Sequence, residues 1–485
     1  YEIGVRLVGS EMCIRDSYVG DKNNDRNNPS PFFESPSTRI SFDRDFNWQY
    51  NAYPLWSWNI LEGSAFAGKG DVTAYDKDKY GPWDLRGDAW DTETFSMGAY
   101  QLVTVPSDRI LRVDAGSKAA SPDGKTWNTA YKNVQEAIDK LAGSNQPGEV
   151  WVKAGTYEPT ELMEAGKDYT AAFIMKDGIS VYGGFAGTEE SRDAREKDED
   201  VGMSWAYKNK TVFVGSAYAV DGQCTWNETD EKWHVTGVSS HVVWLAPTDG
   251  SPAFGHTTVL EGVTIKGGHA LTANAGTFNG DKGAGVYMVR NAELVNCVVT
   301  ENQADGEGGA VYVNGGRITG SLIYNNEASK GGGVYMQNSG LVLRSVLSNN
   351  SAQNGAAVYM KSEDKWTDGL MHPEYLMMST SVVSHNTSRK NGAVYCDRGG
   401  VVLQSTLTNN LSASVTDDAD KTTAHTGGLY VDRYGLVINS VLWNNLINGV
   451  GVPMYAINAS VENVRFYHTA FSAVSYTHLR AHETD

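Results

Sequence analysis

A short segment built around one tyrosine recurs along the second half of the chain, and this repeat restricts the possible folds more than any other feature. In each copy an aliphatic residue precedes the tyrosine, and a glycine stands two to four residues ahead of it. The tyrosines are Tyr287, Tyr312, Tyr335, Tyr359, Tyr395, Tyr430 and Tyr455, spaced by 25, 23, 24, 36, 35 and 25 residues. A period near 24, enlarged at two steps by about a dozen residues, is typical of a solenoid with inserted loops.

A second column, of asparagines, keeps the same period. Each member is the last residue of a short segment that begins with β-branched or aliphatic residues, such as LIYNN or VLSNN. The members are Asn302, Asn326, Asn350, Asn386, Asn410 and Asn445. An asparagine at one position of every unit can stack into an amide ladder, in which each side chain hydrogen-bonds to the next. A ligand-binding stripe is the alternative, and we favour the structural ladder.

The repeat unit predicts strands and turns rather than helices. In residues 308–326, GGAVYVNGGRITGSLIYNN, runs of three to five β-branched and aliphatic residues alternate with Gly, Asn and Ser. Three short strands and three corners per unit suit a coil in which each strand pairs with its equivalent about 4.8 Å above. The Gly-Gly pair supplies a positive φ and a close backbone approach at one corner. We therefore predict an all-β, right-handed, single-stranded parallel β-helix from residue 285 to residue 467.

An N-terminal cap is expected before the coils. Val134, Ala137, Ile138 and Leu141 have helical spacing, so we predict a short amphipathic helix that begins near Trp127 and ends by Gly143. Such a helix can cover the open strand edges of the first coil. Residues 150–152, 173–175, 179–182 and 212–214 are predicted to begin the winding. The charge run at residues 192–200 is predicted to be a solvated loop.

The bulk composition excludes several functional classes. The 485 residues carry a formal net charge of -18, which disfavours binding to nucleic acid and to anionic lipid. No apolar stretch is long enough to span a bilayer. The four cysteines, Cys13, Cys224, Cys297 and Cys396, lie far apart without a CxxC pair, so neither a zinc site nor a disulfide framework is indicated. Cys297 and Cys396 are expected to be buried and unreactive.

The repeat resembles a known family of surface proteins. GGAVY at residues 308–312, together with the aliphatic-x-x-Asn units, resembles the repeats of chlamydial polymorphic outer membrane proteins, whose hallmark pairs GGA(I/L/V) with FxxN. Aliphatic residues stand where that hallmark has phenylalanine: Ile323, Leu347, Val383, Leu407 and Leu442. The entry segment at residues 112–191 is more similar to β-helix surface proteins of Bacteroidetes. The resemblance implies a secreted or outer-membrane-associated protein of the cell surface.

Five segments are predicted along the chain. Residues 1–17 and 474–485 match no neighbouring periodicity and resemble translated sequencing adapters, as found in metagenomic assemblies, so we expect the native chain to continue in both directions. Residues 18–108 resemble the end of a preceding β-helix domain, because MGAYQ at 97–101 partly matches the closing motif of such domains. Residues 109–215 are predicted to hold the cap and first coils of a second β-helix, and residues 216–473 its remaining coils with inserted loops.

The repeat region offers few residues for catalysis. Parallel β-helices include pectin and glycosaminoglycan lyases and hydrolases, and glycoside hydrolysis needs two carboxyl groups in register. Asp417, Asp418 and Asp420 crowd together, but in an inserted loop rich in Thr and Ala. We predict a solvated loop there, with a calcium site as the alternative. No catalytic residue, metal site or other cofactor is predicted.

The inserted loops are the better candidates for binding. In a solenoid the coils form a rigid scaffold, and extra residues emerge as loops that often bind ligands. The loop at residues 361–376 carries Trp366, His372 and Tyr375, which suit stacking on sugar rings. Packing of this loop against the wall of the β-helix is the alternative.

These observations favour a non-enzymatic, adhesin-like surface protein that binds glycans or a host surface. The alternative is a polysaccharide lyase or glycoside hydrolase of the parallel β-helix type. Three or more charged side chains from different coils that converge in a cleft would favour the enzyme. Carbohydrate is the expected partner and nucleic acid is not, while the sequence leaves the ligand and the oligomeric state open.

Overall fold

The computed structural model divides the chain into two compact units, residues 1–103 and 104–485. It describes residues 105–215 except 145, and then 239–362, 376–413, 426–431, 435–447, 450–451, 454–456 and 464–471, together with four separate strands. In the first unit, β1 (Phe33–Ser35) pairs with β2 (Ser57–Ile60) antiparallel. In the second unit, β9 (Cys224–Asn227) pairs with β10 (Lys232–Val235) in the same way.

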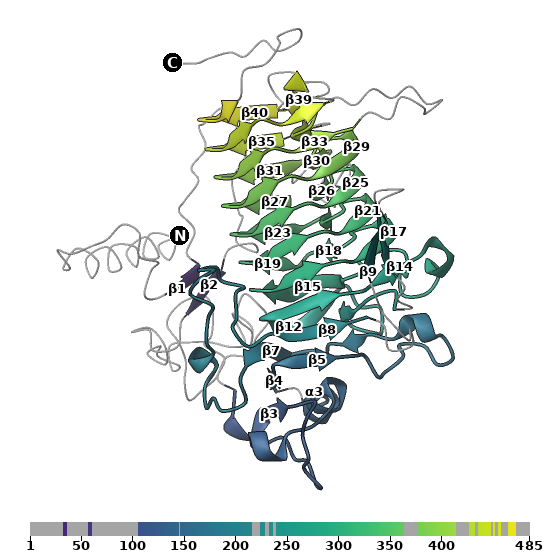
Figure 1. Ribbon diagram of the computed structural model, residues 1–485, viewed down its shortest axis with the longest axis vertical. Helices are drawn as coiled ribbons and strands as arrows, with labels where there is room; N and C mark the ends of the chain where they lie inside the picture. The colour runs from purple at the N-terminus through teal and green to yellow at the C-terminus, as the bar shows by residue number, and fades with distance from the viewer. Residues whose placement is uncertain are drawn as a thin grey trace, which may run out of the picture. The chain divides into compact units, whose positions relative to one another are not determined.

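The second unit is a stack of coils, and Figure 1 shows their strands rising in parallel rows along one axis. One coil consists of four short strands: β18 (Val311–Asn314), β19 (Arg317–Thr319), β20 (Leu322–Tyr324) and β21 (Glu327–Lys330). Each pairs in parallel with its equivalent in the next coil. Every coil therefore extends the sheets begun by the one before it, which is the parallel β-helix predicted from the repeat.

The four strand positions define four rows, which form three sheets. Rows 1 and 2 belong to one 19-stranded sheet, because both are continuous in β15 (Val286–Val295). Row 3 forms a 10-stranded sheet and row 4 an 8-stranded sheet. The prediction of three strands per coil was wrong by one, because Asn-Gly-Gly at residues 314–316 bends one face of the coil into two strands.

The rows contain the following strands. Row 1, which carries the tyrosines, contains β6 (Phe173–Ile174), β11 (Val243–Leu245), β15, β18, β22 (Val334–Gln337), β26 (Val358–Lys361), β30 (Val394–Asp397), β34 (Leu429–Val431) and β39 (Met454–Ala456). Row 2 contains β3 (Ile110–Val113), β4 (Gly148–Lys153), β7 (Ile179–Phe185), β12 (Ala253–Glu261), the end of β15, β19, β23 (Gly340–Leu343), β27 (Leu376–Ser379), β31 (Gly400–Leu403), β35 (Gly435–Ile438) and β40 (Val464–Tyr467).

Rows 3 and 4 complete each coil. Row 3 contains β5 (Gly155–Tyr157), β8 (Thr211–Val214), β13 (Val263–Lys266), β16 (Val298–Thr300), β20, β24 (Val346–Ser348), β28 (Val382–Ser384), β32 (Thr406–Thr408), β36 (Val441–Trp443) and β41 (Ala470–Phe471). Row 4 contains β14 (His269–Ala270), β17 (Gln303–Glu307), β21, β25 (Ser351–Asn354), β29 (Thr387–Asn391), β33 (Leu411–Ser412), β37 (Leu446–Ile447) and the antiparallel β38 (Val450–Gly451).

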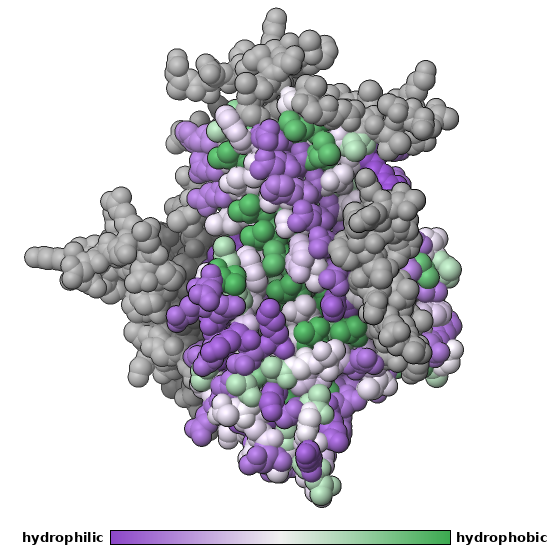
Figure 2. Space-filling model, viewed as in Figure 1, coloured by the Kyte–Doolittle hydropathy of each residue, from purple (hydrophilic) through white to green (hydrophobic). Residues whose placement is uncertain are grey.

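The core is a set of aliphatic columns that run through the coils. Alternate residues of each strand point inward, so Val311 and Val313 are fully buried while the intervening Tyr312 points to the outer side of the sheet. Ile318 and Ile323 fill the core from rows 2 and 3. On the face seen in Figure 2, apolar residues gather in a band along the stack with polar residues on both sides.

The corners explain the paired asparagines of the sequence. The residue before each ladder asparagine has a φ between 51° and 57°, and these residues are Glu301, Asn325, Asn349, His385, Asn409 and Asn444. Asparagine tolerates this left-handed conformation better than most residues. In the Gly-Gly pair, Gly308 has a φ of 74°, and a Cβ on Gly309 would lie 2.4 Å from two backbone oxygens. Both roles predicted for the glycines are present.

The N-terminal end of the stack is covered by the helix α3 (Val134–Leu141), which lies beside β3 and β4 in Figure 1. All four apolar residues predicted to face the coils are buried. The helix begins later than predicted, because Asn133 caps it by accepting hydrogen bonds from the N–H groups of Gln135 and Glu136. Residues 127–129 form a separate 3-10 turn, η3 (Trp127–Thr129). Within the described part of the chain, no helix is long and apolar enough to cross a membrane.

Candidate functional site

The asparagine column is enclosed by the coils. All six asparagines are at most 2% exposed. Asn326 is typical: its Nδ2 donates to Asn350 Oδ1 at 3.0 Å, to Val299 O at 3.0 Å and to Tyr324 O at 2.8 Å. Its backbone N–H also donates to Asn350 Oδ1, at 3.1 Å. With its donors used inside the coil, this column joins successive turns and offers nothing to a ligand.

A second polar ladder, which our sequence analysis missed, runs parallel to the first. Each member lies five residues before a ladder asparagine, and the members are Cys297, Ser321, Ser345, Ser381, Ser405 and Ser440. The N–H of each rung donates to the hydroxyl of the next, as Ser321 N does to Ser345 Oγ at 3.1 Å. Cys297 therefore occupies a serine position, and burial raises the pKa of its thiol to about 12. The constant spacing of five residues before each ladder asparagine could have revealed this second ladder from the sequence.

The tyrosine column is a continuous stack of rings. From Trp244 through Tyr287 and on to Tyr430, neighbouring ring centroids lie 4.5–5.4 Å apart with interplanar angles of 7–14°. Several of the hydroxyls are held by polar side chains: Asn279 Nδ2 donates to the Tyr287 hydroxyl at 3.2 Å, Tyr312 donates to Gln337 Oε1 at 2.5 Å, and Tyr359 donates to Asp397 Oδ2 at 3.0 Å. Tyr287 is 9% exposed and Tyr335 fully buried, so this stack is a packed wall rather than an open sugar platform.

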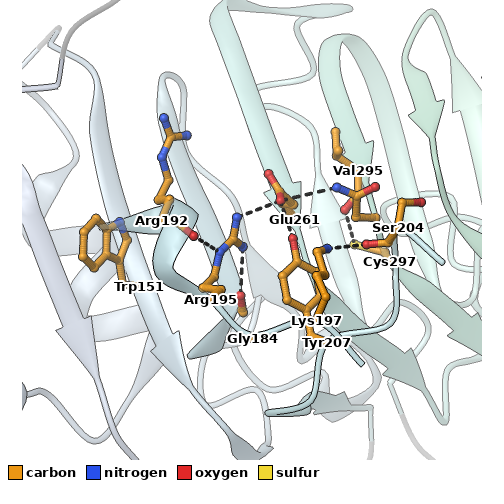
Figure 3. Close-up of polar contacts among 12 residues, drawn as sticks. Trp151, Gly184, Arg192, Arg195, Lys197, Ser204, Tyr207, Glu261, Val295 and Cys297 are labelled. Carbon is orange, nitrogen blue, oxygen red and sulfur yellow. Dashed lines mark hydrogen bonds and ion pairs between the residues drawn. The ribbon is translucent and has the colours of Figure 1, made fainter. Parts of the chain in front are cut away.

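Charged residues converge around Glu261 at the end of β12 (Figure 3). Glu261 Oε1 accepts hydrogen bonds from Arg195 Nη2 at 2.8 Å and from the Tyr207 hydroxyl at 2.6 Å. Nearby, Arg192 Nε lies 3.5 Å from Glu149 Oε1. We call Glu149, Arg192, Arg195, Tyr207 and Glu261 the Glu261 cluster. Burial raises the pKa of the Glu149 carboxyl, against the opposing effect of Arg192.

Most of the charge run at residues 192–200 is exposed, as predicted for a solvated loop, but two of its arginines belong to the Glu261 cluster. The Arg195 side chain is only 7% exposed, whereas that of Arg192 is 38% exposed, with its guanidinium 4.7 Å from the centre of the Tyr182 ring. Outward-facing rings of row 2 and Tyr207 supply flat surfaces for these guanidiniums. The sequence of a charged segment does not reveal the rings and carboxylates that its arginines contact, because those residues come from other parts of the coils.

The Glu261 cluster fits a structural role better than a catalytic one. Its carboxylates are held by arginines, by the Tyr207 hydroxyl and by the Trp151 indole N–H, and none of its members lines the pocket described next. It fastens the segment between β7 and β8 (residues 186–210) to the outside of row 2. Ser204 extends the attachment by donating to Gly320 O at 2.7 Å, two coils further along. Charged side chains from different coils thus converge here, outside the pocket described next.

An open pocket lies at the corner between rows 1 and 2. Two turns from successive coils form it: residues 175–177, between β6 and β7, and residues 247–255, at the entry to β12. Its volume is about 380 Å³. Met175 and Phe254, which are almost fully buried, provide an apolar floor. The polar lining residues are Lys176, Asp177, Thr248, Asp249 and Ser251.

Asp177 orients a histidine at this pocket. Its Oδ2 lies 3.0 Å from Nδ1 of His256, and its Oδ1 accepts the backbone N–H of the same residue at 2.7 Å. Among the described residues, Nε2 of His256 has no hydrogen-bond partner. On the other turn, Asp249 accepts the N–H of Ser251 at 2.8 Å, and this bond lowers the pKa of the Asp249 carboxyl. The pocket therefore combines oriented polar groups with an apolar floor.

Sequence reasoning missed this pocket. Asp177 and His256 are 79 residues apart and belong to no repeat column, so only the winding of the coils brings them together. The predicted loop residues Trp366, His372 and Tyr375, and the aspartates Asp417, Asp418 and Asp420, lie outside the described residues. Among the residues that the structure does describe, no three His, Cys, Asp or Glu side chains are placed to hold a metal ion.

Comparison with known proteins agrees with the repeat architecture. The repeat of the Chlamydia polymorphic membrane protein family matches residues 296–314, which include the first ladder asparagine and the GGAVY segment. The chain is a parallel β-helix repeat protein. No curated protein sequence matches it.

Several solved structures resemble this β-helix at low identity. Pectate lyase Pel9A is 14% identical over 77% of this chain and 78% of its own, with a TM-score of 0.40. Pectin methylesterase PemA from Erwinia chrysanthemi is 12% identical over 77% and 92%, with a TM-score of 0.33. PfbA, a surface adhesin of Streptococcus pneumoniae, is 12% identical over 74% and 78%, with a TM-score of 0.31. The similarity extends to the fold and no further.

Proposed function

We propose that this β-helix is a secreted or cell-surface, adhesin-like protein that binds carbohydrate through the pocket between rows 1 and 2. The observation that carries the proposal is the pocket itself, where an apolar floor and oriented polar groups meet on a rigid scaffold. Saccharide sites combine these features, because a sugar ring has both an apolar C–H face and a rim of hydroxyl groups. The polar groups of the two ladders and of the Glu261 cluster bond within and between the coils, so these features are less suited to bind a ligand.

The cell-surface location rests on the repeat. The matched repeat at residues 296–314 comes from a membrane protein family, and PfbA is a surface adhesin. We further propose that the chain comes from a Bacteroidetes-type bacterium, that residues 1–17 and 474–485 are adapter-derived, and that residues 18–108 end a preceding β-helix domain. Recovery of the complete gene tests all three proposals.

One observation favours a second function. Asp177 and His256 form a carboxylate–histidine pair beside a pocket, and Lys176 and Asp249 line the same pocket from two coils. Such a pair can serve as a general base, because the carboxylate orients the imidazole. An enzyme that acts on polysaccharide through this pocket is therefore the second candidate.

A paired experiment separates the two functions. Purified protein is screened on a glycan array, and the array hits are then incubated with the protein and assayed for new reducing ends or unsaturated products. We expect retention without turnover, and Asp177→Ala should abolish the retention. Asp200→Ala, which changes an exposed aspartate outside the pocket, is the matched control. Product formation that is lost in His256→Ala would instead identify an enzyme, and retention that survives Asp177→Ala would rule out this pocket.

A further inference from the structure

We infer that the pocket between rows 1 and 2 receives an uncharged sugar ring and excludes polyuronates such as polygalacturonate. This inference rests on the proposed carbohydrate-binding function and adds the class of ligand. It follows from three properties of the pocket: its charge, its floor, and the hydrogen-bonding groups that remain available.

The charge of the pocket opposes acidic glycans. Asp177 and Asp249 contribute two negative charges and Lys176 one positive charge, so the charged side chains that line the pocket sum to -1. This pocket sits in a chain of net charge -18. A uronate oligomer brings one carboxylate with every ring, and within a pocket this small its charge lies inside the screening length of about 8 Å at physiological ionic strength. Like charges would therefore oppose its entry.

The floor of the pocket suits the apolar face of a sugar ring. The half-buried Pro247 and Ala253 supply the accessible apolar surface, and Met175 and Phe254, which are 1% and 3% exposed, support it from the core. Met175 belongs to the core and Phe254 is only 3% exposed, so the floor is held rigidly. A rigid floor costs little conformational entropy when a ligand binds.

The polar groups match neighbouring hydroxyls of a neutral ring. Each oxygen of Asp177 already accepts one hydrogen bond from His256, and each retains a second lone pair. A carboxylate with two acceptor oxygens can bind two adjacent hydroxyl groups at once. Lys176 lines the same pocket, and its ammonium can donate to other sugar oxygens. None of these groups needs a charge on the ligand.

Calorimetric titrations test the ligand class. The probes are neutral gluco-, manno- and galacto-oligosaccharides, oligogalacturonate, oligomannuronate and oligoglucosamine, each at 0.05 and 0.5 M NaCl. We expect at least one neutral series to bind with a Kd that changes less than about twofold with salt, because no ionic contact contributes. The uronates should bind at least about tenfold more weakly. Asp177→Asn should weaken binding of the neutral ligand about tenfold or more, as expected for loss of charged hydrogen bonds.

Two variants keep the test independent of folding. Asp177→Asn is nearly isosteric, and Thr248→Trp fills the pocket from an exposed rim position, so both should abolish or weaken binding while the thermal transition stays in place. Asp200→Asn should bind as the wild type does. Tighter binding of a uronate, or salt-sensitive binding of oligoglucosamine, would overturn the uncharged ligand class and leave the carbohydrate-binding function standing. Absence of binding to every saccharide would overturn both.

Discussion

Adjacent asparagines at one corner have different physical roles, which mutation can separate. Asn350 is 1% exposed and belongs to the ladder, where its Nδ2 donates to Ile323 O at 2.9 Å and to Asn386 Oδ1 at 3.0 Å. Asn349 precedes it and holds a φ of 54°. We expect Asn350→Ala to lower the free energy of unfolding by at least about 2 kcal/mol, because several buried polar groups lose their partners. Urea denaturation measures the change.

The neighbouring position supplies the control. Asn349→Gly should leave stability nearly unchanged because glycine adopts a positive φ freely, whereas Asn349→Ala should cost about 1 kcal/mol. Equal effects of alanine at the two positions would contradict the separation of roles.

Cys297 and Cys396 should be inert in the folded protein. Both are free and buried, and burial raises the pKa of each thiol to about 12. The reactive thiolate is therefore almost absent at neutral pH. We predict that iodoacetamide at pH 8 modifies neither residue until denaturant is added, as read by mass spectrometry of their peptides. Because Cys297 occupies a serine position, Cys297→Ser should cost less than about 1 kcal/mol, and a larger loss would argue against that assignment.

At the residue scale, the sequence predicts those columns in which one residue type recurs at a fixed period. The asparagine and tyrosine columns were visible because each keeps its residue type at a fixed period. The serine ladder keeps an equally regular offset, but its first rung is Cys297 and serine is common in turns. Trp244 extends the tyrosine stack although it is not a tyrosine, so the repeat of one residue type did not reveal it. The pair of Asp177 and His256 belongs to no column, so its proximity depends on loop lengths that a sequence pattern does not encode.

At the scale of elements, the attachment of residues 186–210 to the coils depends on Glu261. Arg195 is 7% exposed and Glu261 is 16% exposed, so removal of the carboxylate leaves a buried guanidinium without its partner. We expect Glu261→Ala to destabilise the protein by about 3–5 kcal/mol, or to release the segment while the coils stay folded. Limited trypsin digestion should then cleave after Lys197 or Lys208.

A surface ion pair in the same segment provides the comparison. Glu196 pairs with Lys208 at 2.9 Å, with side chains 59% and 67% exposed. Glu196→Ala should change stability by less than about 1 kcal/mol and leave the digestion pattern unaltered. If both variants are digested alike, the Glu261 cluster does not hold the segment.

Glu149 gives the same region a dependence on pH. Burial raises the pKa of its carboxyl above the ordinary value of 4.5. Between 4.5 and the raised pKa the folded state binds more protons than the unfolded state, so this residue makes stability fall as pH rises through that interval. Glu149→Gln still offers an oxygen to Trp151 Nε1, which donates to the carboxylate at 2.7 Å. We predict that wild type loses stability relative to Glu149→Gln from pH 4.5 upward, measured by urea denaturation, and a difference constant with pH would contradict this.

At the scale of the whole β-helix, the strands of each coil pair only with those of the adjacent coils, so damage should remain local. Ile138 in α3 is fully buried against the first coils, and Ile138→Ala should cost about 2–5 kcal/mol. In a solenoid, stability is approximately a sum of coil and interface contributions. Hydrogen exchange should therefore accelerate in β4 and β7 and remain unchanged in β30 and β31. Leu407→Ala, at a fully buried position in β32, should give the reverse pattern, because its neighbours lie in the distal coils. Uniform acceleration in either variant would mean that the stack unfolds as one cooperative unit, and the capping helix would then stabilise every coil rather than the nearest ones.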